Sequence, residues 1–481
     1  MLFFNKIRPQ ALVCRAPFDG MRGAVGAPNQ TPVGPVSKAS GGTPLGKRGN
    51  SLTPPHDGGG KQVSSFTKDK EKQSNKDREI RRVLGRRDLV ADQMRAASIY
   101  WHYANRAEPD EKLPAKGVTF CGWTQIKDVR TGLMRVESET GYRSFFEGIQ
   151  TCGLRWVCPC CTASAAQHDR AYVNDGLAAA RKAGLRPIMI TLTTRHSKDE
   201  TAADVLDGII RAEQGLKGVK AWRRFCQRIG GYARVLEWTY GKHGHHPHFH
   251  IIVLVRAENE EEAIRAAMEL KAAYMRQLVA CGRDGTSEAA QGHSFHVQGA
   301  GAAGAYVAKW GSAEELTGAL AKAGNGEGLT SWQLLRLART ARDLDEKQRY
   351  AAIWWEIICA TKGRAQLYKS AGWRELVEKH RANKEEPAKP DPDLVHDFGT
   401  RTREPTPEWL QARPRRLSIR EAAESHEDIN IASIAVAAAI KYGRTDAALV
   451  DADDGDDDDD DISLIDDEPD GDVSCPIRPS G

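Results

Sequence analysis

The chain has 481 residues, with 69 Lys and Arg against 65 Asp and Glu and a formal net charge of +4. This length predicts roughly two to four domains. No apolar run approaches the ~18 residues of a membrane span, and the first residues lack the apolar segment of a signal peptide, so we expect a cytoplasmic protein. The ten cysteines are clustered, which favours metal ligands and free thiols over a secreted disulfide framework.

The charge is distributed unevenly along the chain. Fourteen acidic residues and no Lys or Arg lie between Asp451 and Asp472, so the rest of the chain is strongly basic. A basic surface suits a phosphate backbone, because neutralised phosphates release their counterions. We therefore expect DNA as a partner, with a merely soluble basic protein as the alternative. The acidic tail either keeps the protein soluble or competes with DNA as a tethered polyanion.

Residues 1–115 form a mostly disordered basic region in this prediction, since Gly, Pro, Ser and Lys dominate the first 85 positions without sustained periodicity. An amphipathic helix is expected from about Arg87 to Ala104. Beyond the folded part, we expect a helical extension at residues 313–385. A linker, a helix and an acidic disordered tail follow at residues 386–481.

A Cys-rich module is predicted at residues 116–170. Its thiols belong to Cys121, Cys152, Cys158, Cys160 and Cys161. The Cys-x₂-Cys knuckle of Cys158 and Cys161, together with Cys152 and Cys121, supplies four thiolates that fit a tetrahedral structural Zn²⁺. Cys160 is then the surplus thiol, although the choice between it and its neighbours stays open. Buried cysteines without a metal are the alternative.

Residues 185–312 alternate between strand and helix patterns. A buried strand from Arg186 ends in hydroxyls near Thr194. A hairpin follows, in which a turn at residues 241–244 separates the run of residues 232–240 from the His strand that continues into Ile251–Val255. Helices are expected over residues 163–183, 201–229, 258–279, 332–344, 346–361 and 418–442. This order implies a mainly antiparallel sheet covered by helices, which is an α+β fold.

Five of the fourteen histidines fall within positions 243–250, directly before a β-branched run. Because a strand has a two-residue period, His248 and His250 project to one face and Phe249 to the core on the other. Glu237 on the preceding strand alternates with apolar neighbours. If it shares the His face, two imidazoles and one carboxylate converge and leave coordination positions open for Mg²⁺ or Mn²⁺.

The sequence allows other roles for these residues. The histidines can form a solvated loop, and Glu237 can be an ordinary exposed carboxylate. Among rival ligands, His246 shares the strand face if the strand starts early, whereas His243 and His245 are further choices.

Tyr306 and Lys309 are three residues apart after a run of small residues, so on a helix they share a face. A tyrosine can attack a phosphodiester and hold the DNA end as an ester, while a nearby ammonium stabilises the transition state or positions the strand. The alternative is an ordinary half-buried helix tyrosine. Tyr240 and Tyr274 are the next candidate nucleophiles.

The order of these motifs resembles the HUH endonucleases, and more closely the rolling-circle plasmid replication initiators. The strand ending Ile190-Thr-Leu-Thr-Thr194 is similar to the first family motif. His246-Pro-His248-Phe-His250 is similar to the metal motif, and Tyr306-Val-Ala-Lys309 to the nucleophile motif. The resemblance extends from about Cys121 to Trp373.

This resemblance implies an HUH-type sheet and an enzyme that nicks origin DNA. Glu237, His248 and His250 would hold the metal, and Tyr306 would form a 5′-phosphotyrosyl adduct and leave a 3′-OH primer. Duplex origin and single-stranded nick site are the expected DNA partners. No Gly-x-x-x-x-Gly-Lys-Ser/Thr motif is present, so a host helicase and DNA polymerase would be recruited.

Ala302 departs from the family pattern, because some members carry a glutamate there for hydrolytic termination. Two other interpretations remain. One is an HUH transposase or relaxase, and the other is a non-enzymatic, zinc-containing DNA-binding regulator, which would form no covalent adduct with DNA.

Overall fold

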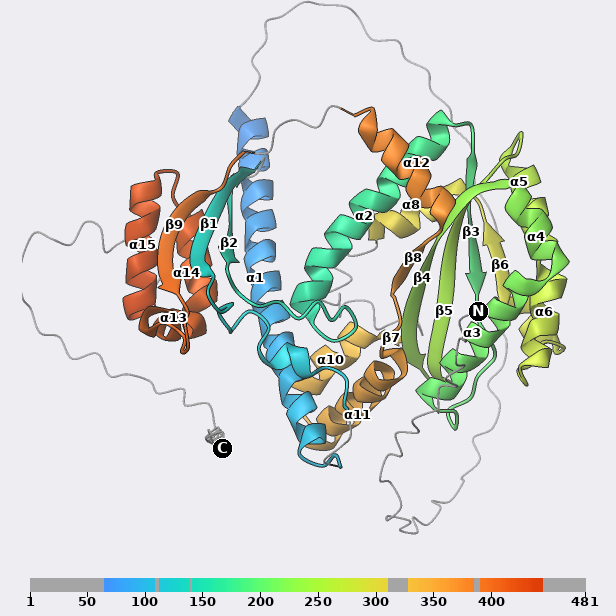
Figure 1. Cartoon of the computed structure of the whole chain (residues 1–481), viewed down its shortest axis with the longest axis horizontal. Helices are drawn as coiled ribbons and strands as arrows, with labels where there is room; N and C mark the ends of the chain where they lie inside the picture. Colours follow the sequence, from blue (N-terminus) through green and yellow to red (C-terminus); the bar gives the residue numbers. More distant parts are fainter. Residues whose placement is uncertain (1–64, 109–111, 139–140, 310–327, 385–389, 444–481) are drawn as a thin grey trace, which may run out of the picture. The chain divides into compact units, whose positions relative to one another are not determined.

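The protein is represented by a computed structural model that describes residues 65–108, 112–138, 141–309, 328–384 and 390–443 (Figure 1). The side chains of residues 65–84 and 305–309 are outside this description, as are the predicted acidic tail and most of the basic N-terminal region. The described residues divide into two compact units. The first comprises residues 65–124 and 150–384, and the second comprises residues 125–149 and 390–443.

The first unit is built on a six-stranded sheet of order β6-β3-β5-β4-β7, with β8 also paired to β4. Its strands are β3 (Arg186–Leu192), β4 (Ile229–Gly241), β5 (Gly244–Val255), β6 (Phe295–Gln298), β7 (Leu329–Thr330) and β8 (Leu367–Lys369). Every pairing is antiparallel. The long hairpin β4–β5 forms its centre, where β-branched side chains suit a pleated, buried surface.

Helices cover both faces of this sheet (Figure 1). They are α2 (Pro159–Lys182), α3 (Ala202–Gly218), α4 (Lys220–Gln227), α5 (Glu260–Met268), α6 (Lys271–Ala280), α7 (Glu288–His293), α8 (Ala300–Lys309) and α12 (Ala371–Ala382). Phe249, Ile251 and Val253 lie in one core with α3 and α6. Ile252 and Leu254 lie in a second core with α2, α8 and α12. The prediction of an α+β fold with an antiparallel sheet flanked by helices is confirmed.

A helical layer completes the first unit. Its members are α1 (Ser65–Ala104), the short helix η1 (Lys116–Thr119), α10 (Ser331–Thr340) and α11 (Leu344–Thr361). Helix α1 begins 22 residues earlier than the helix expected from about Arg87. None of the described helices is long and apolar enough to cross a membrane.

Two predicted long helices of this unit are each broken in two. Val219 separates α3 from α4 by adopting an extended conformation, with φ −88° and ψ 158°. Helix α5 ends at Met268, and α6 starts two residues after Glu269. The apolar periodicity continues across both breaks, so it does not reveal them.

The second unit holds a three-stranded antiparallel sheet of order β2-β1-β9. Its elements are β1 (Arg130–Ser138), β2 (Gly141–Glu147), β9 (Asp393–Thr400), α13 (Pro407–Ala412), η3 (Arg413–Arg415), α14 (Arg416–Glu424) and α15 (Ile429–Tyr442). Leu133, Phe398 and Trp409 are buried in its core. Where one helix was expected over residues 418–442, α14 ends and Asp428 caps a new helix by accepting from the Asn430 and Ile431 amides.

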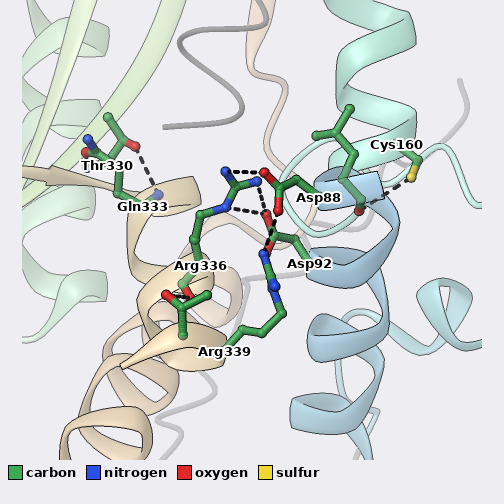
Figure 2. Close-up of polar contacts among 9 residues, drawn as sticks. Asp88, Asp92, Cys160, Thr330, Gln333, Arg336 and Arg339 are labelled. Carbon is green, nitrogen blue, oxygen red and sulfur yellow. Dashed lines mark hydrogen bonds and ion pairs between the residues drawn. The ribbon is translucent and has the colours of Figure 1, made fainter. Parts of the chain in front are cut away.

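Helices α1 and α10 are joined by a four-residue ion network (Figure 2). Arg336 Nη2 lies 2.6 Å from Asp92 Oδ2, and Arg339 Nε lies 2.8 Å from Asp92 Oδ1. Asp88 lies 3.2 Å from Arg336 and 3.0 Å from Arg339. Because the Arg336 and Asp92 side chains are only 7% and 4% exposed, their charges are compensated by the other members of the network and little by water.

We predict that Asp92→Ala destabilises the first unit by up to about 3–5 kcal/mol, since it leaves the buried Arg336 guanidinium with the partly exposed Asp88 as its remaining carboxylate in the network. Denaturant unfolding followed by tryptophan fluorescence measures the effect. Lys379→Ala is the control, because it breaks the exposed pair with Glu375 and should leave the unfolding midpoint unchanged. An unchanged midpoint in Asp92→Ala would show that the network contributes nothing to stability.

Candidate functional site

Glu237, His248 and His250 meet near the middle of the central hairpin. Glu237 on β4 is the cross-strand partner of His248 on β5. His250 projects to the same face two residues further on, and it pairs with Thr191 on β3. One ligand atom from each of the three residues lies within 4.8 Å of the others. The expected convergence of two imidazoles and one carboxylate is therefore present.

The spacing of these atoms suits a divalent ion. Glu237 Oε2 lies 3.1 Å from His248 Nε2 and 3.3 Å from His250 Nε2. Adjacent ligands of an octahedral ion with bonds of about 2.1 Å are separated by roughly 3.0 Å. Three donors on one side leave the other coordination positions for water or a substrate oxygen.

The protonation state of Glu237 also suits a ligand. Burial alone raises the pKa of its carboxyl, but hydrogen bonds and charge from His248 and His250 outweigh burial and hold the pKa well below its usual range. The carboxylate is therefore ionised at neutral pH. With side chains 26% and 15% exposed, Glu237 and His248 remain reachable from solvent.

The second nitrogen of each imidazole contacts a neighbour that orients the ring. His250 Nδ1 lies 3.0 Å from Thr191 Oγ1, and His248 Nδ1 lies 3.4 Å from the His246 carbonyl oxygen. Nδ1 donation to these neighbours would leave each Nε2 lone pair free for a bound ion, and without an ion Nε2 can instead donate to Glu237. Thr191 has no individual role that its own motif predicts, and the signal in the sequence is a buried strand that ends in hydroxyls.

His245 lies on the opposite face of β5 from the ligand set. Its side chain is 5% exposed, and its Nε2 lies 3.1 Å from Glu356 Oε2 on α11. The Trp238 indole donates to its Nδ1 at 3.3 Å. Glu356 also accepts the Ala202 amide at the start of α3. His245 therefore connects the hairpin to two helices, a role that no local pattern predicts because Glu356 is 111 residues away.

His246 shares the face of His248 and His250 but lies outside their cluster. Its ring centroid is 5.4 Å from that of His248 and 4.7 Å from that of His196. Burial, aided by the two neighbouring histidines, lowers the pKa of His246 to about 4, so its imidazole is neutral. His243 is exposed in the hairpin turn.

Tyr306 and Lys309 belong to helix α8, and their side chains are outside the described residues. The preceding turn is described. Ala303 is fully buried in the core that includes Met189 of β3, and Ala302 packs against that core. Helix α8 therefore lies against the sheet beside the strand that pairs with the His strand.

The two rival tyrosines occupy unsuitable places. Tyr274 is fully buried, its hydroxyl donates to the Thr193 carbonyl at 2.9 Å, and burial raises its pKa. Tyr240 lies an odd number of residues from Glu237 on β4, so it projects to the opposite face. Its ring packs 5.0 Å from that of His245.

Four cysteine sulfurs form a second cluster, from Cys121, Cys152, Cys158 and Cys161. The Sγ atom of Cys121 lies 3.5 Å from that of Cys161 and 3.7 Å from that of Cys158. Cys152 Sγ lies 3.7 Å from Cys161 Sγ. Sulfurs around a tetrahedral ion with Zn–S bonds of about 2.3 Å are roughly 3.8 Å apart, so the cluster can hold a metal such as zinc.

Cys160 is directed away from this cluster toward helix α1. Its Sγ lies 3.3 Å from Gln93 Oε1, and the Gln93 amide donates to the Cys121 carbonyl at 2.6 Å. The structure thus brings together the four thiols that the Cys spacing favoured and leaves the surplus thiol outside. Cys158 and Cys161 lie at the N-terminus of α2, where the helix dipole favours thiolates.

Comparison with known proteins adds an independent observation. Residues 144–262 match the family model described as "Replication protein". "Protein rep" of Streptomyces lividans is 28% identical over 177 residues, which cover 31% of this chain and 38% of that protein. No solved structure matches the chain. The predicted resemblance to replication initiator proteins is thereby confirmed, over a segment that contains Glu237, both ligand histidines and three of the four clustered cysteines.

Proposed function

We propose that this protein initiates rolling-circle plasmid replication by nicking origin DNA on an HUH-type nuclease sheet. The observation that carries the proposal is the convergence of Glu237, His248 and His250 on one sheet face. Two further facts support it. Helix α8, which contains Tyr306, packs beside this sheet face, and the matched family is described as replication proteins.

In this proposal Glu237, His248 and His250 hold Mg²⁺ or Mn²⁺. The bound ion would polarise the scissile phosphate and lower the charge that an attacking oxygen meets. Thr191 and the His246 carbonyl keep the imidazoles oriented for binding. The basic chain outside the acidic tail supplies affinity for duplex origin DNA and for the single-stranded nick site.

Tyr306 is the proposed nucleophile. Its phenolic oxygen forms a bond to phosphorus while the bond from phosphorus to the 3′-oxygen breaks. The tyrosine loses a proton, and the departing 3′-oxygen gains one, so the products are a 5′-phosphotyrosyl adduct and a 3′-OH primer. Lys309 is one helical turn further on, where its ammonium would stabilise the developing charge.

Extension of the primer requires a host helicase and DNA polymerase in this proposal. Ala302 supplies no carboxylate for a hydrolytic termination step, so release of the adduct would use other groups. The protein would therefore be a strand-transfer enzyme, in which Tyr306, Lys309 and the three metal ligands carry out the first half-reaction.

We predict that Tyr306→Phe abolishes covalent capture of a single-stranded oligonucleotide, because the phenylalanine ring has no oxygen to attack phosphorus. Denaturing electrophoresis measures the adduct, and oligonucleotide binding should stay near the wild-type level. Tyr240→Phe is the matched control and should retain the adduct. Wild-type adduct in Tyr306→Phe would move the nucleophile elsewhere, and no adduct even in the wild-type protein would favour a non-enzymatic regulator.

We predict that His248→Ala loses Mn²⁺-dependent cleavage, since two donors remain where three are needed. The side chain faces the site, so the unfolding midpoint should change little. His243→Ala in the exposed turn serves as the control with normal cleavage. Full cleavage by His248→Ala at saturating Mn²⁺ would contradict the assignment and point to His246.

We predict about one zinc ion per chain, held by the four clustered cysteines. Cys158→Ser should lose the ion and destabilise the first unit, whereas Cys160→Ser should keep it, because Cys160 contacts Gln93 instead. Metal analysis of the purified variants measures both. Zinc-free wild-type protein that stays folded would leave the cluster as four buried thiols.

A further inference from the structure

A carboxylate from another helix lies at the N-terminus of α8. Glu260 is the first residue of α5, and its Oε2 accepts the Ala300 amide at 2.7 Å. Ala300 is the first residue of α8. The first amides of a helix have no partner within the helix, and its dipole favours negative charge at that end. Glu260 therefore caps the helix that contains Tyr306, from outside that helix.

Gly299 makes room for this contact. A Cβ atom at Gly299 would lie 2.0 Å from Glu260 Oε1 and 2.3 Å from its Cδ, closer than any real Cβ contact. Gly299 has no φ in the left-handed region, so the glycine matters for the space that it leaves to the flexible Glu260 side chain and not for its backbone conformation. The position of the Glu260 carboxylate therefore depends on the absence of a side chain at residue 299.

The described side chains of α8, at residues 300–304, are all Ala or Gly, so they offer little surface that could hold the helix in one position on the sheet. Ala303 is buried, but Gly301 and Gly304 have open space where a side chain would be. Small residues permit close packing, yet they do not prevent a helix from sliding along its axis or turning about it. The exposed hydrogen bond between Glu260 and the Ala300 amide adds one fixed contact at the end of the helix, which opposes both movements.

Glu260 is itself connected to the metal-ligand strand. Strand β5 ends at Val255, and α5 begins five residues later with Asn259 as its N-cap. The Asn259 side chain accepts the Glu262 amide at 2.9 Å, which fixes the start of α5. The chain therefore leads from the end of the His strand to the start of α5 within five residues, and Glu260 at that start contacts the helix that contains Tyr306.

We propose that Glu260 is a positioning residue that sets where α8 places Tyr306 relative to Glu237, His248 and His250. The proposal rests on Tyr306 being the nucleophile. Tyr306 lies six residues beyond the capped amide, so a shift at the cap moves the attacking oxygen as well. A misplacement of about 1 Å can slow a reaction about a hundredfold.

The test is a double-mutant cycle on Glu260 and Gly299, measured as the first-turnover rate of adduct formation at saturating oligonucleotide with Mn²⁺. Glu260→Ala should slow this rate by about tenfold to a hundredfold, with unchanged oligonucleotide affinity and unfolding midpoint. Glu260→Gln should restore most of the rate, because an amide oxygen still accepts the hydrogen bond. Glu261→Ala, a change to an exposed carboxylate in the same turn, is the matched control.

Gly299→Ala should slow the rate as Glu260→Ala does, because its Cβ displaces the carboxylate. The two changes together should be no slower than either alone, whereas independent structural damage would multiply. A wild-type rate in Glu260→Ala, or equal losses in Glu260→Ala and Glu261→Ala, would overturn the proposal while Tyr306→Phe stays inactive. Adduct formation by Tyr306→Phe would instead overturn the proposed nucleophile, and the positioning role with it.

Discussion

The pairing register of β4 and β5 is the constraint on which the candidate metal site depends. Glu237 faces His248 across the ladder, and a shift of β5 by one residue would turn both ligand histidines toward the other face. The turn helps to set this register, because Gly241 pairs with Gly244. Gly244 has φ 90°, and a Cβ there would meet the Ser197 carbonyl oxygen at 2.9 Å, so both conformation and space require glycine.

Burial on both faces of the sheet reinforces the same register. Ile252 and Leu254 continue the face of the ligand histidines into the core with α2, α8 and α12. Helix α2 starts at the Cys cluster and packs so closely on α12 that a Cβ at Gly176 would lie 2.4 Å from the Trp373 ring. Helix α2 thus connects the Cys cluster with α8 and α12 on the metal-ligand face, so the position of one part limits the others.

Strand periodicity explains how much of the site could be predicted from the sequence. His248 and His250 were assigned to one face and Phe249 to the core because alternation is a local property, and the same rule separates His245 from them. The Cys-x₂-Cys spacing likewise placed Cys158 and Cys161 together. Two strands joined by a short turn usually pair with each other, so the sequence places Glu237 beside the histidine strand. It leaves open whether Glu237 lies on the same face of the sheet as the ligand histidines.

Contacts between distant segments could not be predicted in this way. Strand β1 pairs with β9, where Gly132 faces Asp397, and no local pattern links segments so far apart. Glu260 and Ala300 are 40 residues apart, and a glutamate at a helix start is explained equally well by its own helix dipole. Periodicity therefore predicts which side chains share a face. A contact by which one helix caps the start of another, such as that of Glu260 with Ala300, depends on the completed fold.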